Sequence, residues 1–249
     1  MKQSNMNNQL IIEETASTNS YLRELSTKEE LSDFFSVRAN FQTQGRGQRG
    51  NSWVSSPKDN LLCSLILYPT CVSANRSFYI SQIVSLSLIQ TLSPFGSDFS
   101  IKWPNDIYWR NKKIAGILIE NQFLSDSVSQ SIIGIGLNIN QSTFPAQLSN
   151  PISLYHITGT EHNIDELWTT FIHHLKELYQ LLNEGKAGQV KMEYHNNLFR
   201  KEGYHLYRDE HGLFKAHLLK VQPDGQLILV DRENKLRKYY FKEVSYIIE

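Results

Sequence analysis

Several features are scarce in this chain of 249 residues. It has two cysteines, Cys63 and Cys71, which are too few for a disulfide framework or a cysteine-rich metal site. No apolar run approaches the roughly 18 residues of a membrane-spanning helix. The polar first nine residues contain no apolar core of a secretory signal. These absences predict a soluble cytoplasmic protein that does not bind membranes.

An excess of charge of one sign is also missing, because Lys+Arg and Asp+Glu number 25 each. This balance argues against a general nucleic-acid-binding surface, although it leaves room for a local basic site. The eight histidines are scattered. His173 and His174 are adjacent within a helical pattern, and adjacent positions do not share a helix face. No metal site is therefore expected.

The pattern of apolar residues predicts an α+β protein with a mixed β-sheet flanked by helices over residues 1–200. After Gly203, short apolar runs separated by turns predict a small β-barrel over residues 201–249. The expected strands of the first region are 10–13, 34–41, 60–68, 99–103, 107–109, 114–120 and 131–138, and its helices begin near residue 17 and cover 77–92, 164–182 and 188–199.

The segment 42–53 reads Gln-Thr-Gln-Gly-Arg-Gly-Gln-Arg-Gly-Asn-Ser-Trp and lies between two apolar strand-like runs. Glycines let backbone N–H groups approach an anion closely, because they lack a Cβ and tolerate positive φ. Arg46 and Arg49 add donors suited to carboxylate or phosphate. The segment is interpreted either as an anion-binding loop or as a flexible surface connection.

Three further polar segments have similar alternatives. Segment 17–19 (Ser-Thr-Asn) either binds a ligand or caps a helix. Segment 102–106 (Lys-Trp-Pro-Asn-Asp) ends an apolar strand, where it either faces a ligand or forms an ordinary turn. Lys113 begins the next apolar strand, and it needs an anion nearby if it points inward rather than into solvent.

Together with segment 134–140 (Gly-Ile-Gly-Leu-Asn-Ile-Asn), these motifs strongly resemble those of the biotin–protein ligase family and occur in the same order. The resemblance extends from about residue 10 to the C-terminus. It implies a class II synthetase-like biotin/lipoate ligase catalytic domain over residues 1–200 and an SH3-like β domain over 201–249. Some members begin with a DNA-binding domain. This chain starts almost at the catalytic domain, so the short form without it is expected, with no nucleic-acid partner.

The resemblance also implies a reaction. Biotin and ATP with Mg²⁺ form biotinyl-5′-AMP and pyrophosphate, and a specific lysine of a biotin carboxyl carrier protein then takes the biotin. The alternatives are a lipoate or octanoate ligase or transferase of the same fold, and a non-catalytic biotin-binding regulator. Some family members dimerise through sheet edges, so a homodimer is possible here.

The family's residue roles transfer to matching positions. The resemblance places Lys113 beside the reacting carboxyl and α-phosphate, folds Arg46 over the adenylate, and makes Asp106 a candidate for orienting or deprotonating the acceptor lysine. Phosphates and water are expected to hold most of the Mg²⁺ coordination, so no protein metal site is required. The implied biotin-binding residues are Ser17, Thr18, Asn19, Gln42, Arg46, Gly47, Gln48, Lys113 and Gly116. The implied nucleotide-binding residues are Arg46, Gly47, Gln48, Arg49, Trp53, Asn105, Lys113 and Asn138.

The loop departs from the family pattern at two positions. Gln48 and Asn51 stand where the family often has arginine. The arginine at the first of these positions helps retain the reactive adenylate in the family. Weaker retention is therefore expected here, unless Arg49 takes over that role.

Overall fold

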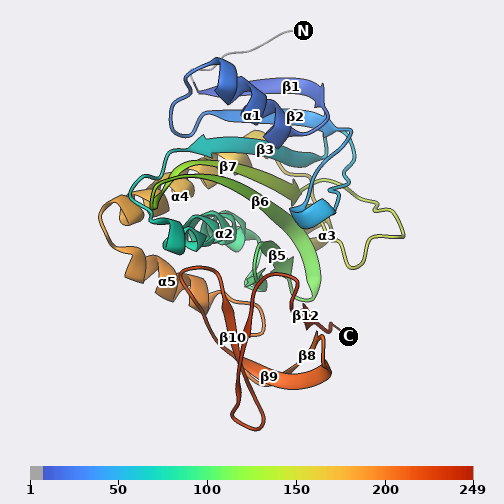
Figure 1. Ribbon diagram of the computed structural model, residues 1–249. Coiled ribbons are helices and arrows are strands. Elements are labelled where there is room, and N and C mark those ends of the chain that lie inside the picture. Colours follow the sequence, from blue (N-terminus) through green and yellow to red (C-terminus); the bar gives the residue numbers. More distant parts are fainter. Residues whose placement is uncertain (1–7, 249) are drawn as a thin grey trace.

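The computed structural model describes residues 8–248, which form two β-sheets and the helices around them (Figure 1). The larger sheet has seven strands in the order β1-β2-β3-β7-β6-β5-β4. Only β1 and β2 pair in parallel, and every other neighbouring pair in this sheet is antiparallel. Its strands are β1 (Gln9–Thr15), β2 (Ser36–Gln42), β3 (Asn60–Leu67), β4 (Phe99–Lys102), β5 (Asp106–Trp109), β6 (Lys112–Leu124) and β7 (Ser127–Asn138).

Helices cover both faces of this sheet (Figure 1). On one face α1 (Thr18–Lys28) packs against β2, β3 and β7. On the other face α2 (Phe78–Leu92) packs against α4 (Ile164–Asn183) and α5 (Ala187–Asn196). The side chain of Asn163 caps α4 by accepting hydrogen bonds from the backbone N–H groups of Asp165 and Glu166, which satisfies donors that the helix itself cannot pair.

The alternation of side chains along the strands separates the two faces. In β3, Leu61, Leu65 and Leu67 join the large apolar core that includes residues of α2 and α4. Ile66 points the other way, into a small core with Leu22 of α1. The same strands therefore supply a large apolar core on one face and a second, partly polar surface on the other.

The smaller sheet has five antiparallel strands in the order β11-β10-β9-β8-β12. Among the hydrogen bonds that connect it to the larger unit, Trp103 Nε1 donates to the Gly225 carbonyl at 2.9 Å, and the Val221 N–H donates to His195 Nε2 at 2.8 Å. The strands are β8 (His205–Asp209), β9 (Gly212–Val221), β10 (Leu227–Asp231), β11 (Leu236–Tyr239) and β12 (Ser245–Tyr246).

The predicted α+β fold, with a mixed sheet flanked by helices and a C-terminal sheet, is confirmed. Closure of the small sheet into a barrel and the domain boundary near residue 200 stay predictions. The hairpin of β6 and β7 is longer than expected, and the short helix α3 (Leu154–Thr158) was not predicted. None of the helices within residues 8–248 combines the length and apolarity needed to cross a membrane.

Candidate active site

A cavity of about 760 Å³ opens on the face of the large sheet where α1 begins. Its wall combines segments far apart in the sequence: the start of α1, the loop after β2, the β4–β5 connection, and residues 241–248 at the C-terminal end. Three of the four predicted motifs reach it with polar side chains, and the fourth, segment 134–140, contributes glycines. The cavity is therefore the place where the sequence motifs meet.

Glycines form the floor of the cavity because neighbouring side chains lie directly on the sheet. In the strand register Gly116 lies beside Gly136. A Cβ on Gly136 would lie 2.3 Å from Cε2 of Trp53, and one on Gly134 would lie 2.1 Å from Oδ1 of Asn19. Any larger residue at these positions would displace Trp53 or Asn19, so the glycines are required by close approach.

The start of α1 is held by a buried hydrogen-bond network. Gln42 Oε1 accepts from the Thr18 backbone N–H at 2.7 Å and from Thr18 Oγ1 at 3.0 Å. Ser64 Oγ lies 2.5 Å from Asn19 Oδ1, to which it can donate, and 2.7 Å from Thr18 Oγ1. Ser17 occupies the N-cap position, but its side chain makes no capping hydrogen bond. Capping therefore does not explain Ser17, whose side chain lines the cavity.

The glycine-arginine loop forms an ordered turn. The Gly47 N–H donates to the Asn51 carbonyl at 2.7 Å, and the Trp53 N–H donates to the Gly45 carbonyl at 2.8 Å. A short 3₁₀ turn spans Gln48–Gly50, and Gly50 has φ 86°, a left-handed conformation that favours glycine. The loop therefore has a defined turn conformation in this structure, and its role in binding an anion stays a prediction.

Lys113 faces the cavity because of a β-bulge. Ile107 pairs with Ala115, whereas the next residue, Tyr108, pairs with Lys113, so Ile114 is an extra residue in β6. Regular alternation would have turned Lys113 to the same face as Ala115, which is in the large core. A bulge can redirect a side chain in this way. Lys113 Nζ forms an ion pair with Asp106 Oδ1 at 2.7 Å, which supplies the anion that an inward lysine requires.

A second lysine lies beside this pair. Lys102 Nζ is 4.0 Å from Asp106 Oδ2, and it sits over the rings of Tyr108 and Tyr246 at 5.1 and 5.2 Å from their centroids. Burial lowers the pKa of Lys102, although the charge of Asp106 opposes this effect. Burial and the Asp106 charge also raise the pKa of Tyr108 to about 12. The site thus concentrates positive charge, which suits an anionic ligand.

Most of the predicted site residues line the cavity. Asn105 also donates from Nδ2 to the Ile117 carbonyl at 2.6 Å. Asn138 is buried and does not line the cavity, and its Nδ2 donates to the Ile152 carbonyl at 3.0 Å, so its nucleotide contact stays a prediction. The side chain of Arg49 lies outside the described part of the chain. Those that line the cavity are Ser17, Thr18, Asn19, Gln42, Arg46, Gly47, Gln48, Trp53, Asn105, Asp106, Lys113 and Gly116.

Sequence reasoning missed several residues of the site. Ser64 and Glu120 hold residues of the cavity wall, Asn19 and Arg46, by hydrogen bonds, and no sequence motif contains them. The spacing along β6 could have indicated Glu120, because it follows Gly116 and Leu118 at every second position, which places all three on one face of the strand. Tyr246 comes from the other sheet, and only the folded chain brings it to the cavity.

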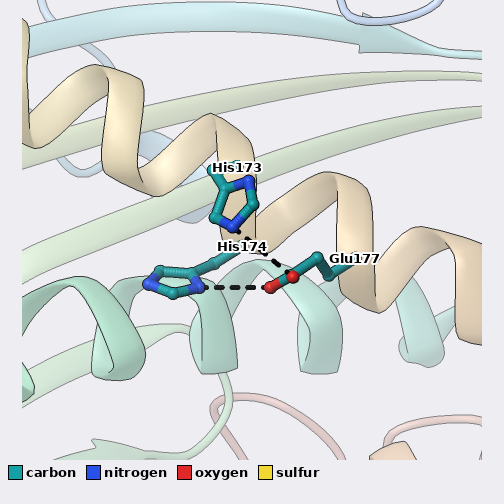
Figure 2. Close-up of side chains that lie close together, drawn as sticks. All are labelled: His173, His174 and Glu177. Carbon is teal, nitrogen blue, oxygen red and sulfur yellow. Dashed lines mark ion pairs between the residues drawn. The ribbon is translucent and has the colours of Figure 1, made fainter.

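One histidine cluster lies away from the cavity, on α4 (Figure 2). Figure 2 shows His173 and His174 both directed at Glu177, with nitrogen–oxygen distances of 3.4 and 3.5 Å. Although adjacent positions do not share a helix face, both side chains thus reach the same carboxylate. Within residues 8–248, no hydrogen bond orients either ring through its other nitrogen, as the ligands of metal sites usually require.

Comparison with known proteins agrees with the motifs. The model of the Biotin/lipoate A/B protein ligase family matches residues 11–138, slightly more than half of the chain. The chain belongs to this family. The matched region contains all four motifs except the last residues of segment 134–140.

Individual members of the biotin/lipoate ligase family are also similar. The bifunctional ligase/repressor BirA of Bacillus spizizenii is 37% identical over 117 residues, which cover 46% of this chain and 36% of that protein. The biotin--[acetyl-CoA-carboxylase] ligase of Mycobacterium tuberculosis is 28% identical over 138 residues, which cover 53% of this chain and 49% of that protein. The chain thus matches half or less of the length of these curated relatives.

Among solved structures, a biotin protein ligase from Aquifex aeolicus, in complex with biotin and ATP, has a TM-score of 0.80 at 25% identity. The likeness covers 96% of this chain and 98% of that one. A biotin protein ligase from Leishmania major in complex with biotinyl-5-AMP has a TM-score of 0.64 at 22% identity, which concerns the fold alone. The fold likeness therefore includes the C-terminal sheet.

Proposed function

We propose that this protein is an ATP-dependent biotin–protein ligase. It activates biotin to biotinyl-5′-AMP with release of pyrophosphate, and it then transfers biotin to a lysine of a biotin carboxyl carrier protein. The observation that carries the proposal is the Lys113–Asp106 ion pair of 2.7 Å beside a glycine floor, opposite the buried polar start of α1. This arrangement offers a polar pocket and a cationic centre in one cavity.

The first step must bring two anions together, the biotin carboxylate and the ATP α-phosphate. Their repulsion has to be offset, and the charge that develops on the phosphoryl oxygens has to be stabilised. In the proposal Lys113 serves both purposes, and Arg46 with the loop's N–H groups covers the adenylate. The carboxylate oxygen attacks the α-phosphorus, and pyrophosphate leaves.

The second step joins biotin to the acceptor. The lysine amine attacks the acyl carbon of the mixed anhydride, an amide bond forms, and AMP leaves. Asp106 is the candidate for orienting or deprotonating that amine. Its two oxygens lie near Lys113 and Lys102, at 2.7 and 4.0 Å, so this carboxylate is surrounded by ammonium groups.

Mg²⁺ enters this proposal as part of the ATP substrate complex. Among the described residues that line the cavity, Asp106 is the only carboxylate, and it is paired with lysine. This donor set does not form a dedicated cage for a divalent cation. Phosphate oxygens and water would supply most ligands of the ion, as Mg²⁺ commonly requires.

The direct test incubates the protein with biotin, MgATP and a biotin carboxyl carrier domain, and follows the mass of the carrier. We expect one biotin to be added to the carrier's target lysine. A carrier in which that lysine is replaced by arginine is the control. Absence of biotinylation under conditions where a known biotin ligase modifies the same carrier would overturn the proposal.

The first alternative is a lipoate or octanoate ligase or transferase, which the family name also includes. The relative from Mycobacterium tuberculosis reported above is named as a biotin ligase, and the polar network at Thr18, Asn19 and Ser64 suits a ureido group, which has both donors and acceptors. A thermal-shift comparison of biotin with lipoate, each with ATP, separates the two. Stronger stabilisation by lipoate would favour the alternative.

The second alternative is a biotin-binding regulator without turnover. The presence of both Lys113 and Arg46 at the cavity argues for catalysis, because binding of the ureido ring alone needs neither. In the carrier assay a regulator would bind biotin and leave the carrier unmodified. The same assay therefore decides this alternative as well.

Retention of the adenylate is a finer part of the proposal. Gln48 lines the cavity where the family often has arginine, and a neutral amide attracts a phosphate less strongly than a guanidinium. We expect biotinyl-5′-AMP to leave faster from this protein than from its Gln48→Arg variant, measured without a carrier. Equal half-lives would remove this part of the proposal.

A further inference from the structure

Glu120 lies just beyond the floor of the cavity and connects three parts of the site. It is on β6, on the same face as Gly116 and Leu118, but it does not line the cavity. Its carboxylate contacts Asn19 and Arg23 of α1, and Arg46 of the glycine-arginine loop. No other carboxylate within residues 8–248 binds both α1 and this loop.

The two oxygens of Glu120 divide these contacts. Oε2 accepts from Asn19 Nδ2 at 2.8 Å and from Arg46 NH2 at 3.0 Å. Oε1 pairs with Arg23 NH2 at 2.5 Å. Asn19 is 3% exposed and is fixed on its other side by Ser64. One end of the network is therefore rigid, whereas the Arg46 side chain is 39% exposed and depends on the carboxylate.

We propose that Glu120 is a positioning residue that holds the Arg46 guanidinium against the start of α1, so that both face the same ligand. This role rests on the proposed function, because Arg46 belongs to the proposed active site and Glu120 would set its position. Arg46 uses one nitrogen for this contact. A guanidinium has five N–H donors in a fixed plane, so the remaining donors can face an anion in the cavity.

The charges explain why a carboxylate is needed. Arg23 and Arg46 both contact Glu120, so without its charge two guanidinium groups would repel each other across a neutral side chain. Burial by itself raises the pKa of Glu120, but hydrogen bonds from Arg23 and Asn19 and the charges of both arginines lower it overall. Glu120 is therefore ionised near neutral pH and can hold Arg46 there.

Glu120 could also act simply by stabilising α1 through Arg23 and Asn19. The two roles differ in how the effect reaches the ligand. A positioning role acts through Arg46, so it disappears once Arg46 is removed. A role through α1 and Asn19 does not depend on Arg46, so the loss that it causes would add to that of Arg46→Ala.

The experiment is a double-mutant cycle of Glu120→Ala and Arg46→Ala, with Glu120→Gln as a variant of matched volume. The matched control is Glu24→Ala, which breaks the exposed Lys28–Glu24 pair on α1, the helix that also carries Arg23. KM for biotin and kcat are measured by biotinylation of a carrier domain. We expect Glu120→Ala to raise the KM for biotin about tenfold, equivalent to ~1.4 kcal/mol, with a smaller effect on kcat. Glu24→Ala should leave both unchanged.

The double-mutant cycle and the rate of trypsin cleavage together test the positioning role of Glu120. The double variant should be no worse than Arg46→Ala alone, and additive losses would overturn the proposal. Trypsin cleavage after Arg49 in the native protein reports on the loop without any activity, and it should be faster in Glu120→Gln than in wild type. Equal cleavage together with an unchanged KM would overturn the positioning role. Failure of wild type to biotinylate would instead overturn the proposed function, while the cleavage rates would still test the contact with Arg46.

Discussion

The two faces of β6 and β7 carry different kinds of residues. Towards α2 and α4 the strands present Ala115, Ile117, Ile133 and Ile135, all buried in the large apolar core. On the opposite face they present glycines and Leu118 to the cavity, and Glu120 just beyond it. Since the backbone is shared, the difference lies entirely in alternating side chains.

The two faces contribute differently, one to the stability of the fold and the other to the proposed chemistry. The core face gains stability from buried apolar area, and size matters there because the interior is closely packed. The cavity face lacks side chains where Trp53 and Asn19 approach the sheet, and its polar groups are positioned by hydrogen bonds. Substitutions on the two faces should therefore change different measurements.

The largest expected effect is at Lys113 on the cavity face. Lys113→Ala removes the cation beside Asp106, and the loss of one such transition-state contact typically costs about 10²–10³-fold in kcat. Carrier biotinylation measures the rate. Lys58→Ala, which removes an exposed lysine, is the control. A Lys113→Ala variant that biotinylates at the normal rate would refute this assignment.

On the core face, Ile133→Ala should lower the free energy of unfolding by about 2–5 kcal/mol, since it leaves a cavity in a packed interior. Ile133 is fully buried. Urea denaturation measures the change, and activity per folded molecule should stay close to wild type. Ile133→Val should cost only about 0.5–1.5 kcal/mol. A loss of activity without a loss of stability would break the distinction between the faces.

A substitution in the glycine floor should lower activity more than stability, and its effect on activity should be smaller than that of Lys113→Ala. Gly136→Ala places a methyl group 2.3 Å from Cε2 of Trp53, so the indole must move. We expect a roughly ten- to hundredfold loss of kcat/KM from misplacement, with stability changed less than in Ile133→Ala. Gly188→Ala on α5, where a Cβ meets nothing within 4 Å, is the matched control and should retain full activity.

The smallest effect concerns the contact between the two sheets. His195 accepts from the Val221 N–H through Nε2, so this nitrogen must be unprotonated. Burial lowers the pKa of His195 from its usual 6.5, and below pH 6.5 the unfolded chain therefore binds more protons than the folded one.

Stability should accordingly fall as the pH drops below about 6.5 towards the lowered folded pKa, and it should be fully present above pH 6.5. Thermal unfolding between pH 7.5 and 5.5, in steps, measures this dependence. His195→Leu should flatten the curve, whereas His211→Gln, at an exposed position, should leave it as in wild type. An identical slope in His195→Leu would exclude His195 as its source.

The sequence predicted the sheet, the helices and the residues that meet at the cavity, because apolar periodicity and glycine-rich motifs are local signals. It did not predict how Lys113 reaches the cavity. Regular alternation would have placed Lys113 with Ala115, and the extra residue Ile114 in β6 reverses its direction. A bulge depends on pairing with a second strand, so a single strand's sequence does not reveal it.

The supporting residues were harder to predict than the motif residues for a similar reason. Glu120 and Arg46 are 74 positions apart, and Ser64 and Asn19 are 45 apart. Their contacts arise only when β3, β6 and α1 are packed together. Tyr246 shows the same dependence on tertiary structure, because it reaches Lys102 from the second sheet.

The most direct measurement of the central claim is biotin-dependent exchange of labelled pyrophosphate into ATP, because it follows adenylate formation without a carrier. Wild type should exchange with biotin and not with lipoate, and Lys113→Ala should lose the exchange while its melting temperature stays near that of wild type. Absence of exchange in wild type, or normal exchange in Lys113→Ala, would contradict the claim that the cavity face of the sheet activates biotin.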